Sequence, residues 1–108
     1  MQSKPMKKLR NIAPGNVLLK EFMNPLGISR NALARATRVP PRRINEIVFG
    51  KRAITADTAL RPATFFGTSE GFWFGLQADY DLEETRRGIG QELLRVEQAR
   101  AEYRIQRR

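Results

Sequence analysis

Two short helical segments joined by a tight turn constrain the fold of this chain more than any other feature. The spacing of apolar residues predicts one helix over Ser29–Thr37 and a second over Pro41–Phe49. Ser29 is a favourable N-cap, and Gly50 suits the left-handed residue that follows the end of a helix. Because the turn around Arg38 is short, the two helices must cross closely.

The inward positions of these two helices suit a close crossing, because their side chains are small or aliphatic. These positions hold Ala32, Leu33, Ala36, Val39, Ile44 and Ile47. The outward positions of the second helix hold Arg42, Arg43, Asn45 and Glu46. In the major groove of DNA, Arg can pair with guanine, Asn with adenine and Glu with cytosine.

Further cations flank these outward positions and are placed to contact phosphates. They are Arg30 and Arg35 on the first helix, and Lys51 and Arg52 after the second. In a helix-turn-helix motif the first helix rests on the DNA backbone while the second enters the major groove. The pattern therefore favours such a motif, bound to double-stranded DNA, over a helical hairpin whose outer face is merely basic.

The rest of the chain also repeats its apolar residues at helical spacing, and no window alternates with the period of a strand. The predicted fold class is therefore all-α. Further helices are expected from Pro14 to about Met23, from Thr55 to Gly67, after Ser69, and over 88–108. Their inward residues include Val17, Leu18, Phe22, Ala59, Leu60, Ala63, Phe66, Phe72, Trp73, Leu76 and Tyr80. Pro62 predicts a kink, or a helix that breaks and restarts.

Composition narrows the function. The chain has 108 residues, of which 41% are apolar, enough for one domain with a core. Its 20 Lys and Arg outnumber its 11 Asp and Glu, and the net charge of +9 indicates a polyanionic partner. The absence of Cys and His excludes thiolate zinc sites and the commonest general base. We expect a non-enzymatic binding protein of the cytoplasm, without cofactor or membrane span.

Residues 12–83 resemble the HigA/VapI-type antitoxins, in the Xre-like branch of the lambda-repressor-like helix-turn-helix proteins. The strongest match is VPPRRINEI at 39–47, followed by GKRAITADTAL at 50–60. Other matches are PG at 14–15, NPLGIS at 24–29, NALAR at 31–35, FGTS at 66–69, FW at 72–73 and LQADYDL at 76–82. The chain departs from the family at Ala13 and Asn16, at Arg38, where Gly is usual, and at Pro62.

The resemblance implies a bundle of about five α-helices, usually a homodimer. Such proteins neutralise a small basic toxin, typically a RelE-like (HigB-type) mRNA endonuclease, and repress their own operon by binding palindromic operator DNA. Carried over by position, the DNA-binding residues would be Arg30, Pro41, Arg42, Arg43, Asn45, Glu46, Lys51 and Arg52. The protein would be cytoplasmic and associated with the nucleoid. The alternative is a stand-alone Xre-family transcriptional regulator without a toxin partner.

Three parts are expected along the chain. They are a flexible basic arm over 1–11, a helix-turn-helix DNA-binding domain over 12–83 with its motif at 29–49, and a C-terminal helical extension over 84–108. The extension could be a docking helix, a dimerisation helix or a helix that forms only on a partner. RNA binding and enzymatic activity are the remaining, less favoured functions.

One stretch, 62–85, carries acidic residues and no Lys or Arg. Its carboxylates belong to Glu70, Asp79, Asp81, Glu83 and Glu84. We interpret them as a solvated face; a surface for a basic toxin and, remotely, a Mg²⁺ site are the alternatives. Trp73, in the same stretch, is interpreted as core or dimer packing rather than a platform for stacking bases.

Overall fold

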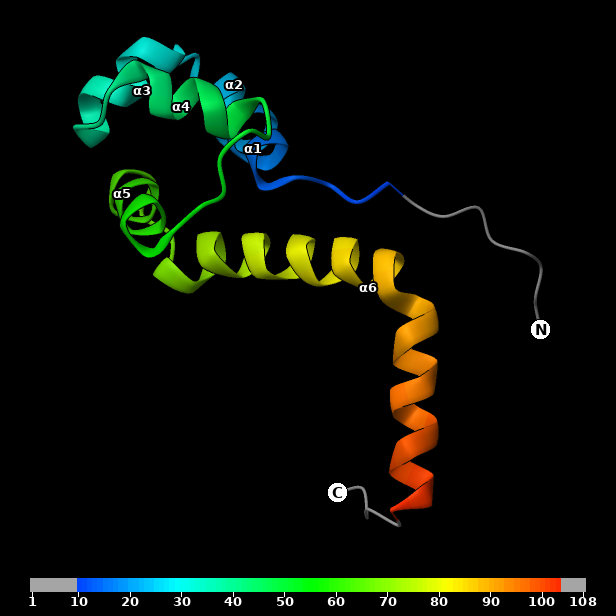
Figure 1. The fold of residues 1–108 in the computed structure, drawn as a ribbon. Coiled ribbons are helices and arrows are strands. Elements are labelled where there is room, and N and C mark those ends of the chain that lie inside the picture. Colours follow the sequence, from blue (N-terminus) through cyan, green and yellow to red (C-terminus); the bar gives the residue numbers. More distant parts are fainter. Residues whose placement is uncertain (1–9, 104–108) are drawn as a thin grey trace.

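The computed structural model describes residues 10–103, in which every regular element is a helix (Figure 1). In chain order these are α1 (Pro14–Val17), the π-helical segment η1 (Leu18–Met23), α2 (Asn24–Leu26), α3 (Arg30–Thr37), α4 (Pro41–Val48), α5 (Ala56–Phe66) and α6 (Glu70–Glu102). The first three follow one another without a break, so the described residues form five helical segments. The all-α, five-helix prediction is confirmed. None of these helices combines the length and apolar character needed to cross a membrane.

The predicted pair of helices is present, and its boundaries follow the predicted signals. Ser29 Oγ accepts a hydrogen bond from the backbone N–H of Ala32 at 3.0 Å, which caps α3. Arg38 ends α3 in the left-handed conformation, with φ of 63°. Pro41 then begins α4 at a position where its missing N–H would have no helical partner. The second helix ends one residue earlier than predicted, at Val48.

The core lies where the helical segments converge. Trp73 of α6 is fully buried, and its indole Nε1–H donates to Thr68 Oγ1 at 2.7 Å. Its ring packs on Phe22, with 4.7 Å between ring centroids. The other buried apolar residues are Leu18, Met23, Leu33, Ala34, Val39, Ile44, Ile47, Val48, Ile54, Ala59 and Ala63. Trp73 therefore packs the core, as predicted.

Three predicted inward positions are wrong. Ala36 is exposed, Leu60 on α5 is 45% exposed, and Phe72 on α6 is 38% exposed. On α3 the core-facing places are taken by Ala34 and Thr37 instead. Thr37 is buried because its Oγ1–H donates to the backbone oxygen of Leu33 at 2.7 Å, which satisfies the hydroxyl. A count of apolar residues alone misses such a position.

Gly15 allows α1 to lie directly against α4. A Cβ at this position would be 1.9 Å from the backbone oxygen of Ile47, which is far inside contact distance. Both Gly15 and Ile47 are buried at this crossing. The N-terminal helical run therefore supports the inner face of α4 and leaves the opposite face of that helix free.

Pro62 does not break its helix, so of the two predicted alternatives, a kink or a break with a restart, the break is wrong. α5 runs from Ala56 to Phe66 as one helix with Pro62 inside it. The proline ring is buried and lines a small internal space together with Leu33 and Trp73. Burial of the apolar ring offsets the lost helical hydrogen bond, so tertiary packing overrides the local preference.

The two C-terminal helices expected from the sequence are joined. α6 spans both, and a kink at Ile89, with φ of −120° and ψ of 24°, separates its two halves. The first half lies along the other helices, whereas the second half turns away from them (Figure 1). We call residues 14–88 the helical bundle and residues 90–103 the C-terminal arm. The arm explains a radius of gyration of 18.3 Å, against about 13 Å for a compact domain of this length.

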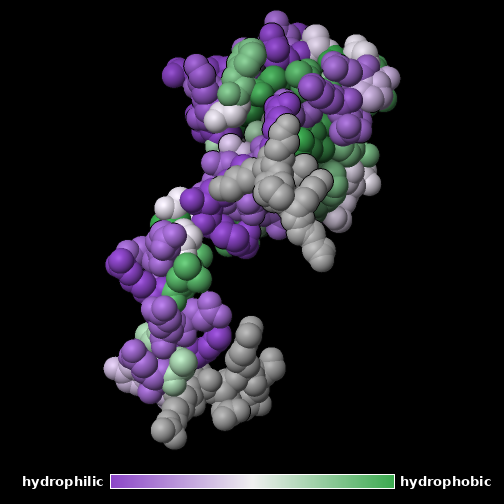
Figure 2. Space-filling model, turned by 90° about the vertical axis from the view of Figure 1, so that its right-hand side faces the viewer, coloured by the Kyte–Doolittle hydropathy of each residue, from purple (hydrophilic) through white to green (hydrophobic). Residues whose placement is uncertain are grey.

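Apolar side chains on the C-terminal arm remain exposed to solvent. Leu93 is 42% exposed and Val96 is 65% exposed. Figure 2 shows hydrophobic atoms among hydrophilic ones on this projecting part of the molecule. Within the part of the chain that the structure describes, the apolar side chains of the arm therefore lie largely in solvent.

Candidate nucleic-acid interface

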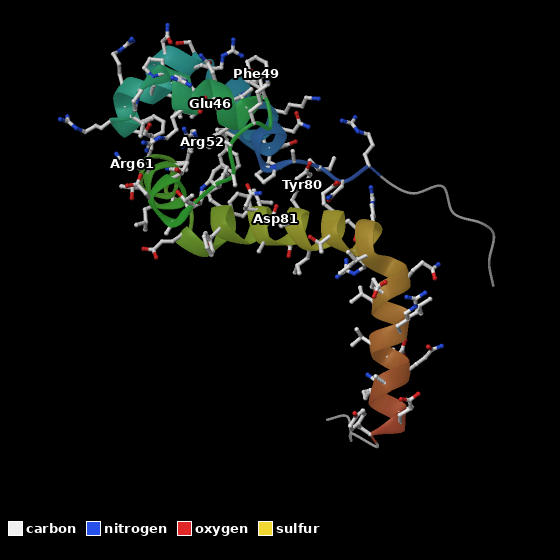
Figure 3. The ribbon with its side chains drawn as sticks, in the orientation of Figure 1. Glu46, Phe49, Arg52, Arg61, Tyr80 and Asp81 are labelled. Carbon is white, nitrogen blue, oxygen red and sulfur yellow. The ribbon has the colours of Figure 1, made fainter. Side chains whose placement is uncertain are left out.

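The residues predicted to contact DNA lie at the start of α3, along α4 and in the loop after α4. Five of them are exposed: Arg30, Pro41, Arg42, Lys51 and Arg52. Three are half-buried: Arg43, Asn45 and Glu46. Figure 3 shows Glu46, Phe49 and Arg52 along α4 and the loop that follows it. The fold therefore brings residues from two helices and a loop to one side of the bundle.

Arg30 joins this set through an aromatic residue that the sequence analysis did not select. The guanidinium carbon of Arg30, on α3, lies 5.1 Å from the centroid of the Phe49 ring, at the end of α4. This is a cation–π distance. Phe49 is 61% exposed, so the ring holds Arg30 beside the outer face of α4. Its place next to Gly50 was visible in the sequence, but nothing there indicated that Arg30 would reach it.

Glu46 is held between two arginines. Its Oε2 accepts from Arg42 Nε at 3.1 Å, and its Oε1 accepts from Arg52 Nε at 2.8 Å. These two hydrogen bonds, that from Arg52 first, lower the pKa of the Glu46 carboxyl below its ordinary value. Glu46 is therefore ionised at neutral pH, and both of its oxygens already accept hydrogen bonds within the protein.

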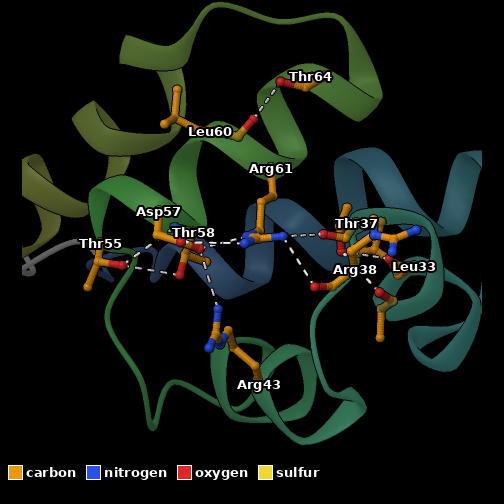
Figure 4. A network of polar contacts seen from close by, with 11 residues as sticks. Leu33, Thr37, Arg38, Arg43, Thr55, Asp57, Thr58, Leu60, Arg61 and Thr64 are labelled. Carbon is orange, nitrogen blue, oxygen red and sulfur yellow. Dashed lines mark hydrogen bonds and ion pairs between the residues drawn. The ribbon is translucent and has the colours of Figure 1, made fainter.

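Arg43 does not point straight out from α4, contrary to its predicted outward position. Its Nη1 lies 3.4 Å from Asp57 Oδ1, on α5, and the side chain is only 29% exposed. The same carboxylate accepts from Arg61 Nε at 2.6 Å. Arg61 first, and then Arg43, lower the pKa of Asp57 (Figure 4). A helical wheel of α4 alone cannot show that α5 supplies this partner.

Arg61 also reaches the turn of the helix-turn-helix. Its Nη1 donates to the backbone oxygen of Thr37 at 2.8 Å and to that of Arg38 at 3.2 Å (Figure 4). These carbonyls belong to the end of α3 and to the left-handed residue after it, where helical partners run out. Arg61 therefore ties α5 to the turn that sets the position of α4. The sequence offered one signal, the spacing of four between Asp57 and Arg61.

Asn45 carries hydrogen-bonding capacity that the described residues do not use. Its Oδ1 atom is buried and accepts no hydrogen bond from them. Buried polar atoms usually have a partner, so this amide is an exception. Pairing with an adenine edge needs the donor and the acceptor of the amide together, so Asn45 must turn Oδ1 outward to make that contact.

The carboxylates of the acidic stretch are spread along α6, and those of Asp81, Glu83 and Glu84 accept hydrogen bonds from other residues of the chain. Gln77 donates to Asp81 at 2.9 Å, and Asn11 donates to Glu84 at 3.0 Å. Glu83 accepts from Arg86 and Arg87, both at 2.7 Å. Within residues 10–103, no group of acidic residues is arranged to hold a metal ion.

Comparisons with known proteins agree with this geometry. Residues 19–73 match the helix-turn-helix family. The chain is 50% identical over 72 residues to virulence-associated protein I of Dichelobacter nodosus, which covers 67% of each chain. It is 34% identical over 79 residues to antitoxin HigA-1 of Vibrio cholerae, covering 73% of this chain and 74% of the relative.

Its structure is similar to that of the Pseudomonas aeruginosa antitoxin HigA described with the higBA promoter. The TM-score is 0.75 and the sequence identity is 40%, over 78% of this chain and 91% of that chain. The matched region of the sequence contains both motif helices and the loop after α4. The chain belongs to the Xre-like helix-turn-helix family and, within it, to the HigA/VapI-type antitoxins.

Proposed function

We propose that this protein is an antitoxin that binds operator DNA through α4, represses its own operon and neutralises a small toxin. The observation that carries the proposal is the outer face of α4, where hydrogen-bonding side chains are flanked by exposed cations. The likeness to an antitoxin described with its promoter supports the same use of this face. As in other helix-turn-helix proteins, α4 would lie in the major groove.

The proposed contacts divide by chemistry. Arg42 and Asn45 hydrogen-bond to base edges, and Pro41 packs against the groove at the start of α4. Arg30, Lys51 and Arg52 contact phosphates on either side. Arg43 and Glu46 also belong to the interface, although both are partly engaged within the free protein.

Two copies of the chain would bind one operator. A palindromic site needs a two-fold symmetric protein, with half-sites about one helical turn of DNA apart or a multiple of it. The proposal therefore includes a homodimer that presents two α4 helices to the same face of the duplex. Binding at its own promoter would then block transcription of the operon.

The toxin partner is proposed to be a small basic protein of the RelE-like, HigB type, an mRNA endonuclease. The antitoxin relative supports a toxin partner for this chain. The first half of α6 carries two exposed carboxylates, Asp79 and Asp81, each of which is available to a cation of a basic protein. Asp81 is labelled in Figure 3. In this scheme the protein has no catalytic role of its own and needs no cofactor.

The proposed organisation assigns DNA binding to residues 12–83 and leaves 84–108 as a helical extension. The basic arm over 1–11 falls almost entirely outside the described residues, which begin at Arg10. A protein with these partners would act in the cytoplasm, at the nucleoid.

The DNA-binding half is tested with a fluorescently labelled duplex from upstream of the protein's own operon. Scrambled duplex and RNA of equal length serve as controls, over a series of salt concentrations. Tight binding to the operon duplex alone, at physiological salt, is the expected result. Equal and steeply salt-dependent binding to every polyanion would mean that the net charge acts without sequence readout.

The neutralising half is tested with the product of the neighbouring gene. That protein is co-expressed with the tagged antitoxin and purified through the tag, and its cleavage of mRNA during translation in vitro is measured with and without the antitoxin. Co-purification and loss of cleavage are expected. Specific DNA binding without any co-purifying neighbour would instead fit a stand-alone regulator.

A further inference from the structure

We infer that Glu46 is a positioning residue, which orients Arg42 and Arg52 toward DNA and does not itself read a base. The inference rests on the proposed function, since it assumes that α4 binds operator DNA. The geometry that carries it is the arrangement of two guanidinium groups around one carboxylate, on α4 and the loop after it. Figure 3 labels Glu46 and Arg52 in this arrangement.

Both oxygens of Glu46 accept a hydrogen bond, one from Arg42 and one from Arg52, whereas each arginine donates, among the described residues, through its Nε alone. A guanidinium group has further N–H donors on its two Nη atoms. Within residues 10–103, these Nη groups of Arg42 and Arg52 have no hydrogen-bond partner. They are the atoms that pair with the O6 and N7 atoms of guanine or with phosphate oxygens.

Burial places the carboxylate beneath the arginines. The side chain of Glu46 is 25% exposed, whereas that of Arg42 is 85% exposed and that of Arg52 is 46% exposed. An approaching duplex therefore meets the guanidinium groups first. A carboxylate facing phosphates without a partner would be repelled, but three groups that together carry one positive charge are not.

The backbone fixes the loop in the register that this arrangement needs. Gly50, with φ of 75°, allows the chain to reverse after α4. Lys51 N–H then donates to the backbone oxygen of Glu46 at 2.7 Å. Glu46 thus accepts from the loop through its main chain and, at the next residue along, through its carboxylate. Arg52, on a loop that could otherwise swing freely, is held over α4 by Glu46.

The test measures operator affinity and the coupling between Glu46 and its two partners. The variants are Glu46→Ala, Arg42→Ala, Arg52→Ala and the two double variants that combine Glu46→Ala with each arginine change. Each is titrated against the labelled duplex from upstream of the operon, a scrambled duplex, and a panel in which every base pair of the protected site is changed in turn. Circular dichroism and urea unfolding confirm that each variant folds.

Glu83→Ala on α6 is the matched control. Glu83 also accepts from two arginines, Arg86 and Arg87, so this variant removes the same charge and the same kind of contact away from α4. A change in affinity that comes from the net charge of the whole protein appears in both variants, whereas the local effect of a charge beside the DNA appears only in Glu46→Ala, because exposed charges are screened over distance. The dependence of the Glu46→Ala loss on Arg42 and Arg52 then separates positioning from this local charge effect.

Positioning by Glu46 predicts a loss of about fivefold in operator affinity for Glu46→Ala, and a smaller loss on scrambled duplex, where only the phosphate contact of Arg52 is affected. The loss caused by Glu46→Ala should be smaller when Arg42 or Arg52 is already Ala, because one of the two side chains that Glu46 orients is then absent. A loss confined to one base pair and unchanged in both arginine backgrounds would show that Glu46 reads that base, and would overturn the inference. If the wild-type protein binds operon and scrambled duplexes equally, the proposed operator binding is wrong, and the inference about Glu46, which rests on it, is wrong as well.

Discussion

The helical bundle and the C-terminal arm share the same spacing of apolar residues but differ in how far those residues are buried. In both, leucines recur at helical spacing, yet Leu33 in the bundle is 1% exposed and Leu93 in the arm is 42% exposed. The bundle buries its apolar stripes because several helices close around Trp73. Among the described residues, the arm is a single helix with ion pairs along it, such as Arg95 with Glu92 at 3.4 Å. Periodicity therefore predicts a helix, whereas burial depends on whether another element faces it.

The largest expected effect comes from one substitution made in both regions. Leu33→Ala should lower the free energy of unfolding by about 2–5 kcal/mol, since it leaves a cavity in the core. Leu93→Ala should change it by less than about 0.5 kcal/mol, because its side chain is not packed. Urea unfolding followed by Trp73 fluorescence measures both values. A comparable loss in Leu93→Ala would show that the arm packs on a surface in solution, such as a second copy.

A glycine-to-alanine pair sharpens the same comparison. Gly15→Ala should destabilise the protein by about 1–3 kcal/mol, because the new Cβ would collide with the backbone of Ile47 and push α1 away from α4. Gly90→Ala has open space around its Cβ and should favour the helical arm by about 0.5–1 kcal/mol.

Circular dichroism and urea unfolding separate these two outcomes. Gly15→Ala should move the unfolding midpoint, whereas Gly90→Ala should raise the helical signal of the native protein and leave the midpoint in place. If Gly15→Ala were neutral, the close crossing of α1 and α4 would not contribute to stability.

The sequence predicted most of what depends on neighbouring residues. Ser29, Pro41 and Gly50 mark helix ends by their own backbone chemistry, so the motif helices were found within a residue. Prediction from the sequence failed at positions whose conformation depends on an element that is distant along the chain. Pro62 is tolerated because the core receives its ring, and Arg43 turns because α5 presents a carboxylate to it.

The features of the candidate site also divide into those that depend on neighbouring residues and those that depend on distant ones. That Arg30, α4 and the loop residues Lys51 and Arg52 share one side of the bundle follows from the helix-turn-helix pattern. The ring of Phe49 beneath Arg30 and the contact of Arg61 with the turn depend on side chains that meet only in the folded chain. No spacing rule within one helix contains that information.

A third comparison is between Arg61, which connects α5 to the turn after α3, and Arg95, which among the described residues contacts only its own helix. Arg61→Ala removes hydrogen bonds to two backbone oxygens of the turn and to Asp57, so it should lower the unfolding temperature clearly. Arg95→Ala removes one contact with Glu92 on its own helix and should leave that temperature unchanged within error. Thermal unfolding by circular dichroism measures both. Equal effects would mean that Arg61 is no more important to the fold than an ion pair on the arm.

The smallest expected effect is the change of folding stability with pH. Its sign follows from the lowered pKa values of the carboxyl groups. Arg61 and Arg43 hold the pKa of Asp57 below its ordinary value in the folded protein. Such a group stabilises the fold fully above its unfolded pKa, about 4, and this contribution is lost as the pH falls through the lower folded pKa. Asp57→Asn should therefore lower the urea midpoint at pH 7 and have less effect at an acidic pH below the lowered folded pKa, where wild-type Asp57 has itself lost its charge.

Glu83 provides the contrast, because its pKa is lowered by Arg87 and Arg86, which lie on the same helix just before the kink. Its protonation breaks contacts within α6 and none between elements. Glu83→Gln should therefore lower the helical content measured by circular dichroism slightly, through the part of α6 before the kink. It should leave the urea midpoint of the bundle nearly unchanged at either pH. An equal shift of the midpoint by both variants at pH 7 would show that the kinked part of α6 unfolds together with the bundle.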